Sequence, residues 1–141
     1  MKRNASAVWK GGLKDGKGTI STESGVLSNA PYSFRARFES ETGTNPEELI
    51  AAAHAGCFTM ALSLELDQAG LKADSINTTA AVTLEKTEAG FTITAVHLNV
   101  TAKVPGASKD VFETAAKSAK AGCPVSKVLN ARITMEAKLE E

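Results

Sequence analysis

The sequence predicts an α+β fold, and three observations lead to this prediction. Alternating apolar and polar residues indicate strands in the first forty residues, a long apolar helical run follows, and a second mixture of strands and helices completes the chain. The length of 141 residues, with 43% hydrophobic and 23% charged content, is typical of one globular domain. No internal repeat, low-complexity run or flexible linker divides it, so we expect a single domain over residues 1–141.

The first forty residues are predicted to form strands. Asp15-Gly16 lies between the candidate strands 7–9 and 19–22 and gives the strongest hairpin signal in the chain. Residues 32–38 alternate ring or small side chains with polar ones, which predicts a third strand with one aromatic face. On this interpretation Arg37 lies near the end of the strand and points away from the aromatic face.

A long helix is predicted next. Asn45 can cap it, Pro46 suits its first position, and Glu47 and Glu48 complement the positive end of its dipole. The helix should run over residues 46–69 and stop at Gly70. Residues 49–64 carry no charge on any face, so nearly all sides need a covering, which a domain this small can hardly supply alone. We therefore expect a symmetric homodimer in which two such helices pack together.

The second half begins with two strands, 79–86 and 91–104, joined by a turn at Glu88-Ala89-Gly90. An amphipathic helix is expected over residues 110–121. A short helix should follow, with Cys123 as its N-cap and Pro124 at its first position. The last strand, residues 131–139, alternates apolar odd positions with polar even positions.

Composition excludes several classes of function. Sixteen basic and sixteen acidic residues cancel, and no basic patch with aromatic residues predicts nucleic-acid binding. The opening residues 1–10 lack the apolar core of a secretory signal, which predicts a cytoplasmic protein. The apolar run 49–64 is expected to be too short to span a bilayer comfortably, and it contains His54. We predict no membrane partner and no cofactor.

The two cysteines are the candidates for chemistry, although buried free cysteines are often inert. Cys123 lies at a predicted helix N-terminus, which favours the thiolate. Cys57 lies deep in the long helix, where burial should raise its pKa unless a cation approaches. Their separation excludes a CxxC motif but permits a disulfide if the Cβ atoms come within ~4 Å. In a reducing cytosol such a disulfide is more often transient and catalytic than structural.

Two other functions remain as alternatives. His54 and Cys57 are three apart on one helix face, and Cys123 and His97 could complete a metal site. The spacing is loose, however, and His54 also fits a hydrogen-bonded core histidine. The other alternative is a noncatalytic stress or ligand-binding protein with inert thiols.

Three segments, residues 43–50, 53–58 and 121–126, strongly resemble the OsmC branch of the OsmC/Ohr peroxidases. Residues 22–27 and 37–39 are also more similar to OsmC than to Ohr proteins, and the resemblance covers essentially the whole chain. It implies an OsmC-like fold with antiparallel sheets around a long central helix, in an intertwined homodimer with two active sites at the interface. It also implies reduction of organic hydroperoxides in oxidative and osmotic stress defence, with regeneration by a dithiol such as a lipoylated protein.

The resemblance further implies individual roles: Cys57 peroxidatic, Cys123 resolving, and Arg37 with Glu47 as a charged pair beside them. Arg35 is an alternative to Arg37, because the two share a face of the predicted strand. Ten helical residues separate Glu47 from Cys57 by ~15 Å. Either the chain around Glu47 folds back, or the pair reaches Cys57 from the other subunit, which is our hypothesis.

Four apolar residues could line an entry that favours alkyl or lipid hydroperoxides over hydrogen peroxide. They are Phe34, Phe38, Phe58 and Met60. The alternative for each of them is ordinary core packing.

Overall fold

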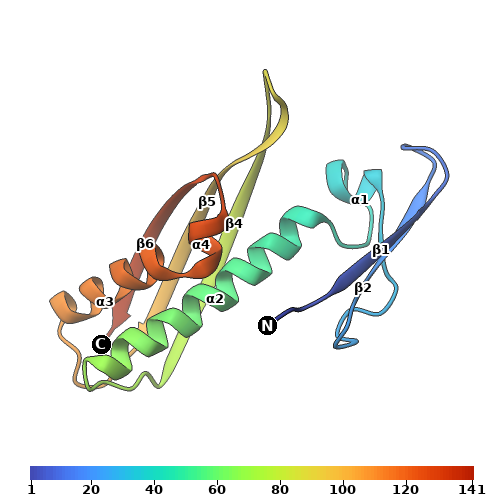
Figure 1. The fold of residues 1–141 in the computed structure, drawn as a ribbon. Helices are drawn as coiled ribbons and strands as arrows, with labels where there is room; N and C mark the ends of the chain where they lie inside the picture. The colour runs from blue at the N-terminus through green and yellow to red at the C-terminus, as the bar shows by residue number, and fades with distance from the viewer. The chain divides into compact units, whose positions relative to one another are not determined.

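A computed structural model describes residues 1–141, which form two compact units (Figure 1). The N-terminal unit is Met1–Leu49 and the C-terminal unit is Ile50–Glu141. Two three-stranded sheets, one in each unit, and one long helix give the expected α+β architecture.

The N-terminal unit contains an antiparallel sheet of β1 (Ala5–Lys10), β2 (Lys17–Thr22) and β3 (Ala30–Tyr32) in the order β1-β2-β3. The predicted hairpin is confirmed, with Lys10 opposite Lys17. Its connection is a six-residue loop, 11–16, rather than a two-residue turn. Gly16 closes this loop, because its N–H donates to the Gly12 carbonyl at 2.8 Å and a Cβ here would lie 2.2 Å from that oxygen.

The prediction of one strand over residues 32–38 is wrong. The chain leaves β3 at Tyr32 and forms the short helix α1 (Phe34–Phe38). Ser33 caps this helix, its Oγ accepting from the Ala36 N–H at 3.1 Å. The rings of Phe34 and Phe38 meet at 4.9 Å, the contact expected for positions i and i+4 of a helix. The spacing of Phe34 and Phe38 thus fits a helix as well as a strand, and the cap at Ser33 favours the helix.

The predicted long helix is α2 (Pro46–Gln68), which begins in the N-terminal unit and continues through the C-terminal unit. Asn45 Oδ1 accepts from the Glu48 N–H at 2.7 Å, and Gly70 has the left-handed φ of 77° expected of a stop. By length and composition α2 could cross a membrane, and 22% of its most apolar 18-residue stretch is buried. The run of residues 49–64 was expected to be too short to span a bilayer, but the whole helix has 23 residues and is long enough.

The C-terminal unit contains a sheet of β4 (Ser75–Thr87), β5 (Gly90–Lys103) and β6 (Arg132–Glu140) in the order β4-β5-β6. β4 and β5 form the predicted antiparallel hairpin, but β6 pairs with β5 in parallel. The expectation of purely antiparallel sheets is corrected here, because a crossover precedes β6. That crossover consists of α3 (Lys109–Gly122) and α4 (Pro124–Val128).

The core of the C-terminal unit lies between one face of this sheet and helices α2 and α3 (Figure 1). It contains thirteen buried residues: Phe58, Leu62, Leu66, Val96, Leu98, Val100, Ala102, Val104, Phe112, Ala115, Ala116, Ala119 and Cys123. Three of them come from α2, so one face of this helix packs against the core. Cys123 belongs to this core, so the crossover between β5 and β6 also places a thiol in the core against which Cys57 of α2 packs.

Candidate active site

The structure brings Cys57 and Cys123 together. Cys57 lies half-buried in the middle of α2, while Cys123 is fully buried between the end of α3 and the start of α4. Both are free thiols, and each shifts the pKa of the other through hydrogen bonding between the two side chains. Residues far apart in the sequence therefore form a thiol pair, as a disulfide-forming centre requires.

The two thiols of this pair differ in acidity. Burial raises the pKa of Cys57, the hydrogen bond with Cys123 raises it further, and the Val125 N–H offsets this only in part. Burial also acts to raise the pKa of Cys123, but the net direction is down. Hydrogen bonding by Cys57, Ser126 and Val125 lowers the pKa by more than burial raises it. The negative charge of the pair is thus favoured at Cys123, as its predicted position at a helix N-terminus indicated.

A polar side chain from α2 joins this pair through Ser126. His54 is fully buried, and its Nε2 lies 2.7 Å from Ser126 Oγ. His54 precedes Cys57 by three positions, and Ser126 follows Cys123 by three, so each lies one helical turn from a cysteine. Of the two roles considered for His54, metal ligand and hydrogen-bonded core histidine, the structure shows the second. Ser126 was missed, although this repeated spacing was a signal.

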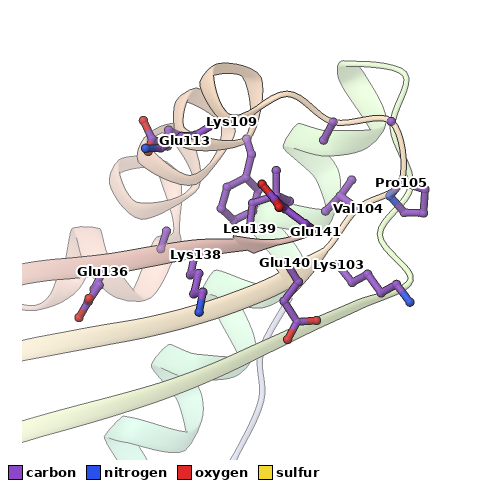
Figure 2. A pocket seen from close by; sticks show the side chains of 14 residues that line it. Lys103, Val104, Pro105, Lys109, Glu113, Glu136, Lys138, Leu139, Glu140 and Glu141 are labelled. Atoms are coloured by element: carbon purple, nitrogen blue, oxygen red, sulfur yellow. The ribbon is translucent and has the colours of Figure 1, made fainter.

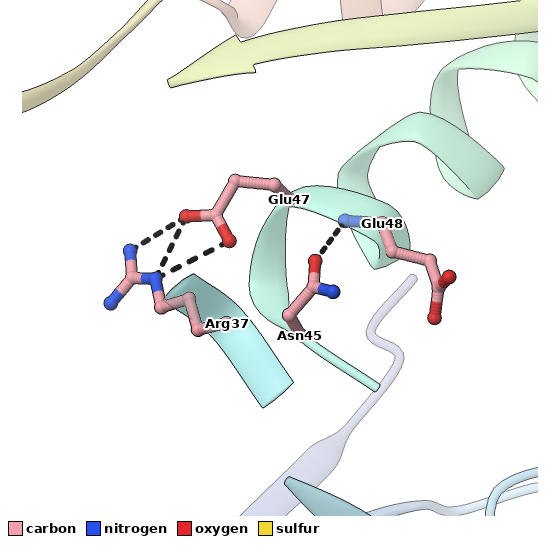
Figure 3. Close-up of polar contacts among 4 residues, drawn as sticks. All are labelled: Arg37, Asn45, Glu47 and Glu48. Atoms are coloured by element: carbon pink, nitrogen blue, oxygen red, sulfur yellow. Dashed lines mark hydrogen bonds and ion pairs between the residues drawn. The ribbon is translucent and has the colours of Figure 1, made fainter. Parts of the chain in front are cut away.

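Arg37 and Glu47 also come together, in the N-terminal unit (Figure 3). Arg37 Nε lies 3.0 and 3.3 Å from the two Glu47 oxygens, and Nη2 lies 2.7 Å from Oε1. The Glu47 side chain is only 11% exposed, which makes this a bidentate, partly desolvated pair. Arg35 instead faces Glu39 at 3.9 Å with 65% of its side chain exposed. Because residues 34–38 are helical, Arg35 and Arg37 point in different directions, and only Arg37 contacts Glu47.

An apolar pocket of about 320 Å³ adjoins Arg37 within the N-terminal unit. Its lining residues are Trp9, Leu13, Tyr32, Ser33, Phe34, Arg37, Phe38 and Pro46. Phe34 and Phe38 therefore lie beside a cation, as an apolar entry would require. Phe58 is fully buried in the core, so its predicted place in such an entry is wrong, and Met60 is 77% exposed on α2.

The residues of the metal-site alternative do not gather. No group of three or more His, Cys, Asp or Glu side chains could hold a metal ion. His97 is exposed on β5 with its Nδ1 bonded to Thr134 on β6 at 2.7 Å, whereas its neighbours Val96 and Leu98 face the core. His97 thus lies on the opposite face of the sheet from Cys123.

A larger cavity of about 770 Å³ lies where β5 and β6 end and α3 begins (Figure 2). Lysines and glutamates surround it, among them Lys103, Lys109 and Glu140, and it contains neither cysteine. The length of α3 separates Lys109 from Cys123 by ~20 Å. This cavity is therefore not part of the thiol centre.

The fold and the thiol pair define an α+β protein with a two-cysteine centre. The sequence model of OsmC-like proteins matches residues 39–138, which covers both cysteines and Glu47. The chain belongs to the OsmC-like protein family.

Individual relatives agree with this assignment. Peroxiredoxin OsmC of Escherichia coli (strain K12) is 55% identical over 140 residues, which are 99% of this chain and 98% of the relative. Organic hydroperoxide resistance protein OhrB of Bacillus subtilis (strain 168) is 30% identical over 124 residues, 87% of this chain and 89% of OhrB. The crystal structure of B. subtilis OhrB superimposes with a TM-score of 0.71 at 27% identity, covering 96% of this chain and 98% of OhrB.

Proposed function

We propose that this chain is a cysteine-based peroxidase that reduces organic hydroperoxides to alcohols. The observation that carries the proposal is the pair of free thiols, Cys57 in the middle of α2 and Cys123 directly before α4, each of which shifts the pKa of the other. It occurs in a chain that is 55% identical over nearly its full length to a protein named a peroxiredoxin. The bidentate Arg37–Glu47 pair adds a fixed cation of the kind that thiolate chemistry uses.

The chemistry requires two steps at the cysteines, followed by reduction of the disulfide that they form. The Cys57 thiolate attacks one peroxide oxygen, the O–O bond breaks, and the alkoxide takes a proton to become the alcohol. Cys57 is oxidised by two electrons to a sulfenic acid. Cys123 then attacks the sulfenic sulfur, the S–S bond forms and the S–O bond breaks, releasing water. A dithiol reduces the resulting disulfide by thiol exchange and becomes a disulfide itself.

Arg37 fits the first of these steps. Cys57 has a raised pKa in the C-terminal unit, so it needs a cation to become the nucleophile. Glu47 engages Nε and Nη2 of the guanidinium and leaves Nη1 for the reacting atoms. An Arg37 beside Cys57 would draw the shared negative charge from Cys123 to Cys57 and donate to the developing alkoxide.

We infer that Arg37 and Glu47 act on Cys57 of a second subunit in a homodimer. Glu47 and Cys57 are ten residues apart on the one continuous helix α2, about 15 Å along its axis, so they cannot serve one site within that helix. On α2 the large apolar side chains of Met60 and Leu64 are 77% and 56% exposed. A partner's helix would cover them.

The apolar pocket beside Arg37 supports organic hydroperoxides as the substrates. Trp9, Phe34 and Phe38 contribute apolar surface to it, which the carbon chain of an alkyl or lipid hydroperoxide would fill and hydrogen peroxide would not. We propose a dithiol reductant, such as a lipoylated protein, which the resemblance to the OsmC branch implies, and we also propose a cytoplasmic location.

The test is to add one equivalent of cumene hydroperoxide to the reduced protein under anaerobic conditions, then to measure free thiols and intact mass. We expect loss of both thiols and, by peptide mapping, a Cys57–Cys123 link inside one chain. A Cys123→Ala variant should stop at a sulfenic acid that dimedone traps. Two untouched thiols in the wild-type chain would refute the peroxidase function.

A further inference from the structure

The buried imidazole of His54 has no role in the two steps above. Its Nε2 bonds to Ser126 Oγ at 2.7 Å, but its Nδ1 is buried and has no hydrogen-bond partner. Leaving a buried polar atom unpaired costs free energy, so an apolar residue would be more stable here if packing alone mattered. The position of this histidine therefore indicates a function of its bonded nitrogen.

The protons on this contact can be assigned. The Ser126 hydroxyl has one hydrogen, and hydrogen bonding from this side chain is one cause of the lowered pKa of Cys123. Ser126 Oγ must then accept from His54, so the ring carries its proton on Nε2. Burial lowers the pKa of His54, which keeps the ring neutral with that single proton. The unpaired Nδ1 is consequently a bare lone pair and not an N–H.

We propose that His54 is a positioning residue for the resolving thiol, fixing the Ser126 hydroxyl as a hydrogen-bond donor to Cys123. His54 Nε2 on α2 lies 2.7 Å from Ser126 Oγ, and Ser126 lies three positions after Cys123, so a hydroxyl held in this way can turn its hydrogen to the thiolate. Without the histidine, the hydroxyl can rotate and donate elsewhere.

This inference rests on the proposed peroxidase cycle and deepens its second step. While Arg37 holds the charge on Cys57 for the attack on peroxide, Cys123 carries the proton. Once Cys57 is a sulfenic acid, Cys123 must lose that proton to attack the sulfenic sulfur, and the proton leaves with the hydroxide as water. The His54–Ser126 contact stabilises the resulting thiolate at the moment it is needed.

Few other groups could do this. The titratable side chains that face Cys123 are Cys57 on α2 and, through Ser126, His54 on the same helix. On α4 the remaining donors are the N–H groups of Val125 and Ser126, which every variant below retains. The effect of His54 on the Cys123 pKa can therefore be measured separately from the effect of the N–H groups at the start of α4.

Three variants in the full chain test the proposal. His54→Leu removes the donor, Ser126→Ala removes only the hydroxyl, and His54→Gln keeps an N–H close to the Nε2 position. One measurement is the pKa of Cys123 in a Cys57→Ala background, followed as thiolate absorbance. The other is the rate of disulfide formation after a peroxide pulse, with dimedone trapping the sulfenic acid.

We expect His54→Leu and Ser126→Ala to raise the Cys123 pKa by about one unit and to slow disulfide formation ~tenfold at pH 7. The lost rate should return when the pH is raised by about one unit, and His54→Gln should stay within about threefold of wild type. The rate of sulfenic acid formation on Cys57 should not fall, because a weaker Cys123 thiolate leaves the shared charge on Cys57.

An unchanged Cys123 pKa in His54→Leu would overturn the proposal, as would a slow disulfide step that no increase in pH restores. If His54→Leu loses its near-ultraviolet circular dichroism, Ser126→Ala decides by the same criteria. The pKa measurement needs no peroxide, so it tests this inference even if hydroperoxides oxidise neither thiol and the proposed function fails.

Discussion

Removing the charge of Arg37 should slow the reaction of Cys57 with hydroperoxides. Replacing Arg37 with Met keeps much of the side-chain volume and removes the charge, along with hydrogen bonds of 2.7, 3.0 and 3.3 Å to Glu47. An opposite charge within 4–6 Å lowers a pKa by about 1–3 units. The Cys57 pKa starts above its usual range because of burial. In the proposed dimer, the Cys57 pKa should therefore remain raised when Arg37 of the second subunit is replaced.

The expected result follows from the thiolate fraction. A rise of one to two pKa units leaves ~10–100 times less Cys57 thiolate at pH 7, and the second-order rate with cumene hydroperoxide should fall by the same factor. Since the thiolate is present above the pKa, the rate of Arg37→Met should recover as the pH rises. The assay is rapid-quench thiol alkylation over pH 5–9 under anaerobic conditions.

Arg35→Met is the matched control. Arg35 is 65% exposed and only 3.9 Å from Glu39, so its loss should leave both the rate and the pH profile unchanged. The reasoning is refuted if Arg37→Met reacts within about twofold of wild type with an unshifted profile, because a charge that sets a pKa cannot be removed without moving it. A large loss in Arg35→Met instead would transfer the role to Arg35.

Three further predictions concern assembly and stability. Met60→Lys should convert the proposed dimer to a monomer in sedimentation analysis and abolish peroxidase activity. The control Lys117→Glu, on the exposed face of α3, should do neither, and an active monomer would rule out action between subunits. Phe58→Ala should lower the free energy of unfolding in urea by about 3–5 kcal/mol, and a loss below 1 kcal/mol would contradict its place in the core. The pKa of His54 is lower in the folded chain than in the unfolded chain, so as the pH falls the unfolded chain binds a proton at this residue before the folded chain does. The free energy of unfolding should therefore decrease below pH ~6.5 by up to ~1.4 kcal/mol per pH unit. His54→Gln should lack this pH dependence.

The parts of the fold that follow from local chemistry could be predicted. The cap at Asn45, the stop at Gly70 and the start of α4 after Cys123 each depend on a few neighbouring residues, and all three are confirmed. The period of two in residues 131–139 likewise located β6 to within a residue at each end. Its direction was missed, because it depends on the connection formed by α3 and α4 and not on the strand itself.

The segment at residues 32–38 shows why pattern alone fails for short elements. Phe34 and Phe38 fit a period of two and also the i, i+4 spacing of a helix, so the cap at Ser33 decides between them. For the thiol centre, the sequence supplied Cys57 and Cys123. Their closeness depends on packing between α2 and the crossover, which no local pattern encodes. The contact of Ser126 with His54, seventy-two positions away, depends on the same packing, and only its spacing of three from Cys123 was visible in the sequence.

The distance along the chain between Cys57 and Cys123 also affects the lifetime of the protein. A bond between them would close a loop of sixty-six positions, and the loss of freedom in the unfolded chain would stabilise the folded state by ~4 kcal/mol. The oxidised form should therefore resist proteolysis more than the reduced form. Peroxide would thus slow the turnover of the molecules that have just reacted with it, so their abundance would rise without new synthesis.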